Sequence, residues 1–411
     1  MKKKGCRPWV VMIIVLSFFL FTGTVSAAEK VVKLGLVLPL TGQAAPVGEF
    51  VKMGNELAVE EINAAGGIKS LGGAKLQLII ADHQMKPEVG IAQAERLVKE
   101  EKVAALLGGY MSAVIYTSSQ VGEKYKVPFI VQGGTSNNIC ERGFKYVFRA
   151  IPNSTVYALD ILHPLKDISK GTSREVKRIG LTYEMTSYGK SNAEAIRGGV
   201  APLGMEIVAD LPYPPQTTDF SLSVSKLKAA NPDAVICVPY VTDAVMLVKT
   251  MKEMDFNTGG VIGTGGFLDP TFTEMLGKMA DYIFQVAYMS ENMKLPSAIK
   301  FHQNMMKKYG KPATGDAAYS YTGMYILRDA IEKAGSLEGT KIRDALASLD
   351  EPHPPWAICS ITGVKFDEKG ENIYARLCTS QYLKGQWWTV WKPEVAKTTA
   401  VWPVPKWSER K

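Results

Sequence analysis

Beyond the first thirty residues, the chain alternates between short apolar runs and longer stretches in which apolar residues recur at helical spacing. Residues 33–40 read KLGLVLPL and predict a strand, and residues 48–64 then follow a helical pattern until Gly66-Gly67 ends it. The same order returns in a second strand at residues 76–80 and a second helix at residues 87–100. Alternation of this kind predicts a parallel sheet with right-handed crossover connections.

The alternation starts again after residues 148–153, so a second α/β half is predicted. A chain of this length is also longer than the length at which one hydrophobic core usually divides into separate domains. Helices near residues 297–309 and 317–334 and late strands around residues 364–366 and 387–391 follow the second half. The strands predicted for the second half span residues 178–183, 234–238, 260–263 and 282–287.

Two patches of glycine and hydroxyl side chains follow neighbouring predicted strands in the first half. The apolar run at residues 103–107 leads into GGYMS at residues 108–112, and the run at residues 128–131 leads into GGTS at residues 133–136. In open α/β sheets, ligands bind at the carboxyl ends of the strands, where the next helix offers unpaired backbone N–H groups to an anion. The two patches are therefore the predicted ligand site.

Residues 1–27 have the features of an export signal. Lysines and an arginine open the segment, an apolar run follows at residues 9–21, and residues 25–27 have the small side chains that a signal peptidase reads. The apolar run is shorter than the roughly 20 residues that span a bilayer, which disfavours an uncleaved anchor. We predict cleavage after Ala27, with Ala28 as the alternative, and a soluble, periplasmic product.

Charge and composition argue against several kinds of partner. The formal net charge is +8, and four of the positive residues belong to the export signal. The other lysines and arginines are mixed with glutamates and form no basic run, so no nucleic-acid partner is expected. The sequence has no CxxC pair, and its four histidines never fall at metal-ligand spacing, so no metal and no cofactor are expected.

The common enzyme motifs are missing from the sequence. Gly35, Gly42 and Gly48 follow the first strand without the G-x-G-x-x-G spacing of a dinucleotide-binding loop. Neither a G-x-S-x-G motif nor a serine and histidine pairing is recognisable. We therefore predict that the protein is not an enzyme.

Several segments along the chain resemble one family. They are VVKLGLVLPLTGQAAPVGEFVKMGNELAVEEINAAGGI, LLGGYMSAV, PFIVQGGTSN, YVFRAIPN and VKFDEKGEN, in this order. Together they resemble the leucine/isoleucine/valine-binding family of type I periplasmic solute-binding proteins, which deliver ligands to the permease subunits of ABC transporters. The resemblance implies an α/β fold with two doubly wound parallel-sheet lobes joined by three crossover strands. It places lobe 1 at residues 28–151 and 288–376 and lobe 2 at residues 152–287 and 377–411.

The resemblance also implies a ligand pocket. Ser112 and Thr135 match positions that bind the carboxylate of an amino acid, and Gly133 matches a position whose backbone carbonyl meets the α-amino group. Hydroxyl donors and helix N-termini suit a carboxylate. Tyr188 and Tyr240 match positions of the second lobe that close over the ligand.

The sequence departs from the family pattern at the ammonium end of the pocket. The acid that pairs with the ammonium group in the family's aliphatic amino-acid binders falls at Gly265, and Val47 replaces a bulky aromatic residue. We therefore expect a roomier pocket on this side, with Tyr110 among the rings available to a ligand. Glu184 or Asp316 replaces the missing acid if either reaches the cleft.

The resemblance implies a solute-binding component of an ABC importer. Its ligand is a branched-chain or related amino acid, held in an interlobe cleft that closes on it, and a monomer is expected. A carboxylate without an amino group, such as an aromatic or aliphatic acid, is the alternative ligand, and a ligand-sensing module is the alternative role.

Cys359 and Cys378 are a candidate disulfide. Symmetric pairing about the predicted turn at residues 367–370 places the two cysteines opposite each other, and an oxidising compartment favours the bond. A crossover between the two strands, or a bulge that shifts their register, would separate them.

Overall fold

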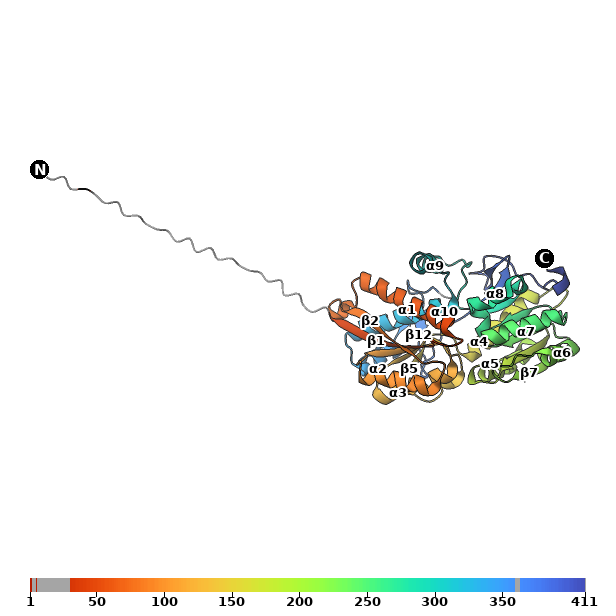
Figure 1. The fold of residues 1–411 in the computed structure, drawn as a ribbon, viewed down its shortest axis with the longest axis horizontal. Coiled ribbons are helices and arrows are strands. Elements are labelled where there is room, and N and C mark those ends of the chain that lie inside the picture. Colours follow the sequence, from red (N-terminus) through yellow and green to blue (C-terminus); the bar gives the residue numbers. More distant parts are fainter. Residues whose placement is uncertain (2–4, 6–29, 359–362, 411) are drawn as a thin grey trace.

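The computed structural model describes Met1, Gly5, residues 30–358 and residues 363–410. The export signal predicted for residues 1–27 lies outside the described residues, apart from Met1 and Gly5. Two α/β lobes lie side by side, each built on its own sheet (Figure 1). Among the described helices, none combines the length and hydropathy needed to cross a membrane.

The first lobe is built on a five-stranded parallel sheet with the strand order β2-β1-β3-β4-β5. Buried apolar runs form its inner strands, as expected for a sheet covered on both faces. Helix α1 begins at Ala45, earlier than predicted, because Pro46 is well tolerated in a first helical turn. The strands are β1 (Val31–Leu38), β2 (Lys75–Asp82), β3 (Ala105–Gly108), β4 (Phe129–Val131) and β5 (Val147–Arg149), and the helices between them are α1 (Ala45–Ala64), α2 (Pro87–Lys99) and α3 (Ser112–Tyr125).

The second lobe contains a seven-stranded sheet with the order β14-β13-β10-β9-β8-β6-β7. Five of its strands are parallel, and the two from the C-terminal region add to the β10 edge in antiparallel orientation. The strands are β6 (Arg178–Glu184), β7 (Glu206–Tyr213), β8 (Ala234–Val238), β9 (Val261–Gly263), β10 (Phe284–Ala287), β13 (Cys378–Leu383) and β14 (Gln386–Trp391). The helices are α4 (Ser154–Ser169), α5 (Ser187–Val200), α6 (Ser221–Ala230), α7 (Val241–Glu253) and α8 (Pro270–Leu276).

The chain then returns to the first lobe, where α10 packs along α1. A Cβ atom on Gly54 of α1 would lie 2.1 Å from the carbonyl oxygen of Ala317, so glycine allows the two helices to approach this closely. The returning elements are α9 (Pro296–Tyr309), α10 (Gly315–Ala334), α11 (Gly339–Ala347), β11 (Asp350–Glu351) and β12 (Val364–Lys365). The described 3₁₀ turns are η1 (Lys69–Leu71), η2 (Asn137–Ile139), η3 (Ala201–Leu203), η4 (Gly265–Leu268), η5 (Gly277–Ala280) and η6 (Trp407–Glu409).

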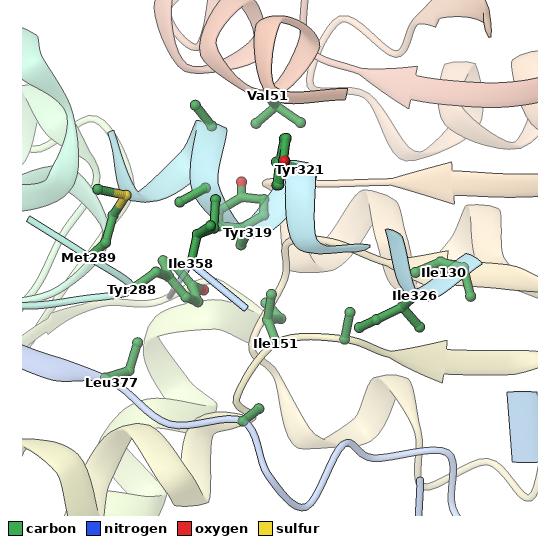
Figure 2. Packing of buried hydrophobic residues seen from close by; sticks show 14 of the residues in the cluster. Val51, Ile130, Ile151, Tyr288, Met289, Tyr319, Tyr321, Ile326, Ile358 and Leu377 are labelled. Atoms are coloured by element: carbon green, nitrogen blue, oxygen red, sulfur yellow. The ribbon is translucent and has the colours of Figure 1, made fainter. Parts of the chain in front are cut away.

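The chain passes between the lobes three times: between β5 and α4, between β10 and α9, and between β12 and β13. The predicted lobe boundaries at residues 151, 287 and 376 lie at these connections, and the boundaries themselves remain a prediction. Ile151, Tyr288 and Leu377 on the connections are buried in one hydrophobic cluster that extends into both lobes (Figure 2). The connections are therefore part of a continuous core.

The predicted disulfide is not supported. Cys378 is a buried free thiol that begins β13, lies opposite Ala287 of β10 and donates to the Ala287 carbonyl oxygen at 3.3 Å. At the predicted turn, Phe366 lies opposite Asn372, one position away from the symmetric register on which the pairing depended. The two cysteines are therefore not partners in one hairpin, since the chain leaves for the second sheet before Cys378; Cys359 itself lies outside the described residues.

Candidate ligand-binding site

A cavity of about 50 Å³ lies between the two lobes and is lined by both. Six of the seven predicted ligand residues line it, whereas Ser112 does not. The predicted residues in the lining are Tyr110, Gly133, Thr135, Tyr188, Tyr240 and Gly265. The other lining residues are Val47, Gly134, Tyr157, Leu268, Tyr288, Asp316 and Tyr319.

The two glycine and hydroxyl patches meet at the end of the first sheet. A Cβ atom on Gly133 would lie 2.2 Å from the backbone nitrogen of Tyr110, so only glycine lets the two loops touch here. Ser112 is the first residue of α3, and its buried hydroxyl accepts a hydrogen bond from the Ser136 N–H group at 3.4 Å. Ser112 therefore supports the loop that carries Thr135 rather than lining the cavity.

A hydrogen bond from the second lobe reaches the Thr135 hydroxyl. Asn192 of α5 donates from Nδ2 to Thr135 Oγ1 at 2.9 Å and also to the Tyr188 carbonyl oxygen at 2.9 Å. A neighbouring bond joins the lobes again, because the Asn137 N–H group donates to Ser191 Oγ at 3.0 Å. Since Thr135 Oγ1 already accepts a bond, its own proton is available to an acceptor in the cavity.

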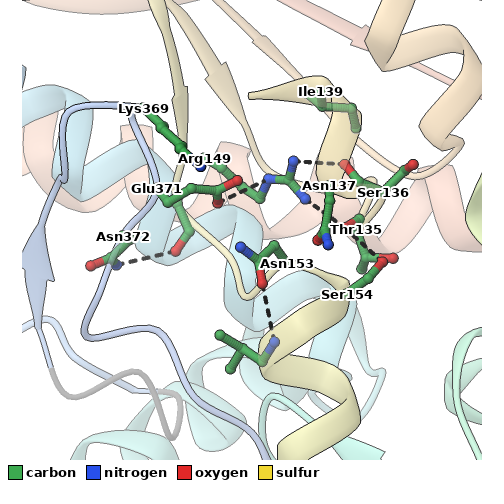
Figure 3. Close-up of polar contacts among 12 residues, drawn as sticks. Thr135, Ser136, Asn137, Ile139, Arg149, Asn153, Ser154, Lys369, Glu371 and Asn372 are labelled. Atoms are coloured by element: carbon green, nitrogen blue, oxygen red, sulfur yellow. Dashed lines mark hydrogen bonds and ion pairs between the residues drawn. The ribbon is translucent and has the colours of Figure 1, made fainter. Parts of the chain in front are cut away.

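A buried arginine stabilises the Thr135 loop by hydrogen bonds to its backbone (Figure 3). Arg149 of β5 is fully buried and donates to the carbonyl oxygens of Thr135, at 2.6 Å, and Ser136, at 2.8 Å. Its Nε atom lies 3.3 Å from Glu371 Oε2, an ion pair that supplies the charge partner a buried guanidinium requires. The YVFRAIPN and VKFDEKGEN segments thus contact each other next to the Thr135 loop.

The space beside Gly265 is filled, so the expectation of a roomier pocket there is wrong. Gly265 has a φ of +51°, and a Cβ atom on it would lie 2.3 Å from the Tyr188 hydroxyl oxygen. That hydroxyl is fixed by a 2.5 Å hydrogen bond with Thr264 Oγ1. Tyr188 therefore occupies the place where the resemblance puts the side chain of an ammonium-pairing acid.

Of the two acids considered as replacements, Asp316 reaches the cavity and Glu184 does not line it. Asp316 lies in the first turn of α10, where burial, followed by the negative charge of Asp269, raises the pKa of its carboxyl group to about 7. Glu184 accepts hydrogen bonds from the N–H groups of Thr186, at 2.6 Å, and Gly189, at 3.0 Å. Its carboxylate is thus used to support the start of α5.

Tyrosine rings make up much of the remaining wall. The Tyr110 and Tyr240 ring centroids are 5.9 Å apart, and those of Tyr188 and Tyr240 are 5.4 Å apart. Tyr157, Tyr288 and Tyr319 were not among the predicted ligand residues, because isolated tyrosines in or near helices carry no periodic signal. The Tyr157 hydroxyl donates to the Tyr288 hydroxyl at 2.7 Å.

A family profile described as "Periplasmic binding protein" matches residues 31–365. The chain belongs to the periplasmic binding protein family. It is 31% identical over 380 residues to the Leu/Ile/Val-binding protein homolog 8 of Brucella abortus, covering 90% of this chain and 93% of that protein. Homolog 7 of the same organism is 29% identical over 398 residues, covering 95% of this chain and 98% of the relative.

Solved structures confirm the type I periplasmic binding protein fold. The branched-chain amino acid transporter substrate-binding protein LivJ from Streptococcus pneumoniae, in complex with isoleucine, has a TM-score of 0.77 at 22% identity, covering 91% of this chain and 100% of that one. A solute-binding protein from Rhodopseudomonas palustris BisB5, in complex with 3,4-dihydroxybenzoic acid, has a TM-score of 0.75 at 20% identity. The match covers 90% of this chain and 98% of that one. Neighbours with this fold thus include proteins solved with an amino acid and with an aromatic acid.

Proposed function

We propose that the protein is the extracytoplasmic solute-binding component of an ABC importer and binds a branched-chain or related amino acid between its lobes. The observation that carries this proposal is the cavity itself, to which each lobe contributes one wall. Thr135 of the first lobe presents a hydroxyl proton beside the start of α3, and Asp316 presents a carboxylate. These groups match the carboxylate and ammonium groups of an amino acid.

The interlobe contacts support binding by closure without chemistry. The bonds of Asn192 with Thr135 and of Ser191 with Asn137 exist only while the lobes are together. A ligand that bridges the lobes favours the closed arrangement by its differential affinity for it. The closed form then delivers the ligand to membrane permease subunits, so we expect a periplasmic, monomeric protein with no enzymatic activity.

The size of the cavity limits what the closed form accepts. One water needs roughly 10–15 Å³ of such space, so about 50 Å³ corresponds to only a few water positions. A leucine-sized side chain therefore requires the tyrosine rings to shift or the lobes to separate slightly. Smaller amino acids fit with less rearrangement, and they belong in any ligand screen.

An aromatic acid is the second candidate ligand, and the six tyrosines of the lining favour it. Stacked or edge-on rings stabilise a bound aromatic ring beyond the area it buries. Against it, a ligand whose only charge is a carboxylate meets the Asp316 carboxylate in the same small cavity. We place the amino acid first for this reason.

Ligand screening tests the proposal. Purified mature protein is melted with each of the twenty amino acids and with benzoate, 3,4-dihydroxybenzoate and 4-methylpentanoate, and every compound that raises Tm is then titrated by calorimetry. We expect at least one amino acid to bind and to reduce the radius of gyration in small-angle scattering. Failure of all these compounds to raise Tm contradicts the proposal.

A further inference from the structure

We infer that Asp316, which lines the interlobe cavity, and Asp269, which follows the lining residue Leu268 in the other lobe, form an ammonium-binding site that makes this protein selective for zwitterionic amino acids over the corresponding deaminated acids. This inference rests on the proposed function, because it assigns the chemistry at one end of the same cavity. It also assigns the acid that replaces the one missing at Gly265.

The lining has one charged side chain in the described part of the chain, and it is Asp316. Its residue is 8% exposed, so the carboxylate has lost most of its contact with water. No lysine, arginine or histidine belongs to the described lining and could neutralise it. Because an isolated buried charge is costly, the group gains strongly from a cation that enters with the ligand.

Asp269 supplies the second carboxylate from the opposite lobe. It precedes α8, is 3% exposed, and accepts a hydrogen bond from the Thr271 N–H group through Oδ1 at 2.8 Å. Its Oδ2 atom is buried without a hydrogen-bond partner among the described residues. The Oδ2 atom of Asp269 is therefore available to accept a hydrogen bond from a ligand.

The two acids lie near each other because the start of α10 packs against η4. A Cβ atom on Gly315 would lie 3.5 Å from Leu268 Cδ2, and these two residues are the chain neighbours of Asp316 and Asp269. Burial, and in addition the negative charge of Asp269, raises the pKa values of Asp316 and Tyr110. Two like charges thus approach across the cleft when the lobes close.

A bound ammonium group changes the sign of this interaction. It attracts both carboxylates, so the repulsion that opposes closure becomes an attraction that favours it. A simple carboxylate brings no such cation and leaves the two acids uncompensated, so closure around it is less favourable.

Matched ligand pairs test the inference at pH 8 by calorimetry. The pairs are leucine with 4-methylpentanoate, alanine with propanoate, and phenylalanine with 3-phenylpropanoate. In the wild-type protein, the amino acid of the best-binding pair is expected to bind at least tenfold more tightly than its deaminated partner. Equal or tighter binding of the deaminated acid overturns the inference without any variant.

Variants locate the selectivity on the two acids. Asp316→Asn is expected to weaken amino-acid binding at least tenfold and to leave binding of the deaminated acid unchanged or stronger, and Asp269→Asn is expected to do the same to a smaller extent. Asp243→Asn is the matched control, because Asp243 is a buried acid of α7 outside the cavity lining.

The outcomes separate this inference from the proposed function. Amino-acid binding that is the same in Asp316→Asn as in the wild type overturns the inference and leaves the proposed function standing. Absence of any binding by the wild-type protein overturns both. A fall in amino-acid affinity in Asp243→Asn as large as in Asp316→Asn also overturns the inference, because the loss then reflects buried acids in general.

Discussion

The two ends of the interlobe cavity satisfy their polar groups in opposite ways. At the Thr135 end, Arg149 bonds two loop carbonyl groups and pairs with Glu371, and Asn192 bonds the threonine hydroxyl. At the Asp316 end, burial raises the pKa of Asp316, and Asp269 Oδ2 has no hydrogen-bond partner in the part of the chain that the structure describes. The Thr135 end therefore pairs its charged group and the threonine hydroxyl without a ligand, whereas the Asp316 end holds two neighbouring acids and no cation in the described lining.

This difference assigns separate tasks to the two ends. Hydrogen bonds that are already formed hold the Thr135 loop in place and leave one hydroxyl proton for the ligand. The acids at the other end cost stability until a cation compensates them, so they gain most from binding. Substitutions at the Thr135 end should therefore reduce stability or general affinity, and substitutions at the Asp316 end should change selectivity and pH dependence.

The largest effect is expected from Arg149→Met. It leaves the Glu371 carboxylate buried without its ion-pair partner and removes both bonds to the Thr135 loop, so the free energy of unfolding should fall by about 3–5 kcal/mol. Chemical denaturation of the ligand-free protein measures this. The control is Lys341→Met, which breaks an exposed pair with Glu338 and should cost less than about 1 kcal/mol. Similar midpoints for both variants would contradict the role given to Arg149.

Thr135→Val is expected to weaken amino-acid binding by about 1.5–3 kcal/mol, because it removes a hydroxyl donor to a charged acceptor while keeping the side-chain shape. The comparison is Ser112→Ala, whose hydroxyl lies beneath the loop and outside the cavity lining. That variant should lose less affinity. Calorimetric titration of both variants checks the order, and a greater loss in Ser112→Ala would move the carboxylate contact from Thr135 to Ser112.

Asp316→Asn is expected to stabilise the ligand-free protein at pH 8 by on the order of 2 kcal/mol, because it removes a buried charge. The folded-state pKa of Asp316 is raised from 3.8 to about 7, so the folded protein holds this proton more tightly than the unfolded chain. Stability contributed by this group is therefore lost as pH rises between about 4 and 7, and amino-acid affinity should rise through pH 7.

Melting curves and titrations from pH 5 to 8.5 measure how the stability of the ligand-free protein and the amino-acid affinity change with pH. The charged and ionisable groups that face Asp316 are Asp269, Tyr110, Tyr157 and Tyr319. Burial raises the pKa values of the three tyrosines well above their ordinary value, so these rings stay neutral in this pH range. The exposed Asp344→Asn variant should keep the wild-type slopes. Unchanged slopes in Asp316→Asn would show that another group titrates.

The smallest effect is expected from Asn192→Ala, which removes an interlobe hydrogen bond without changing the lining. Affinity should fall by about 0.5–1.5 kcal/mol, and the ligand-free protein should become more extended in small-angle scattering. Lys190→Ala, an exposed change on the same helix, is the control. A more compact Asn192→Ala protein would contradict its role in closure.

The sequence predicted the fold class and the first-lobe side of the cavity because both follow from local patterns. Short buried strands end in glycine and hydroxyl patches, and parallel topology alone brings such ends together. The short strand β5 was missed because the charged Arg149 interrupts its apolar run. The antiparallel orientation of β13 and β14 depends on sheet-edge pairing that is not visible in the order of elements.

The Asp316 end of the cavity depends on contacts between residues that are far apart in the chain. No local pattern reveals that the Tyr188 hydroxyl fills the space beside Gly265, or that Asp269 lies close to Asp316. Arg149 carried a signal that the sequence analysis did not use, namely a charged residue within an apolar strand. Such a residue is rarely buried without a partner, so it indicates a distant carboxylate.

A crystal structure of the protein with its best-binding amino acid tests the central claim most directly. We expect the ligand between the lobes, with a carboxylate oxygen within hydrogen-bond distance of Thr135 Oγ1 and the ammonium nitrogen within hydrogen-bond distance of the Asp316 carboxylate. A ligand outside this cavity, or one whose ammonium group points to Thr135 while its carboxylate lies at Asp316, would contradict the account.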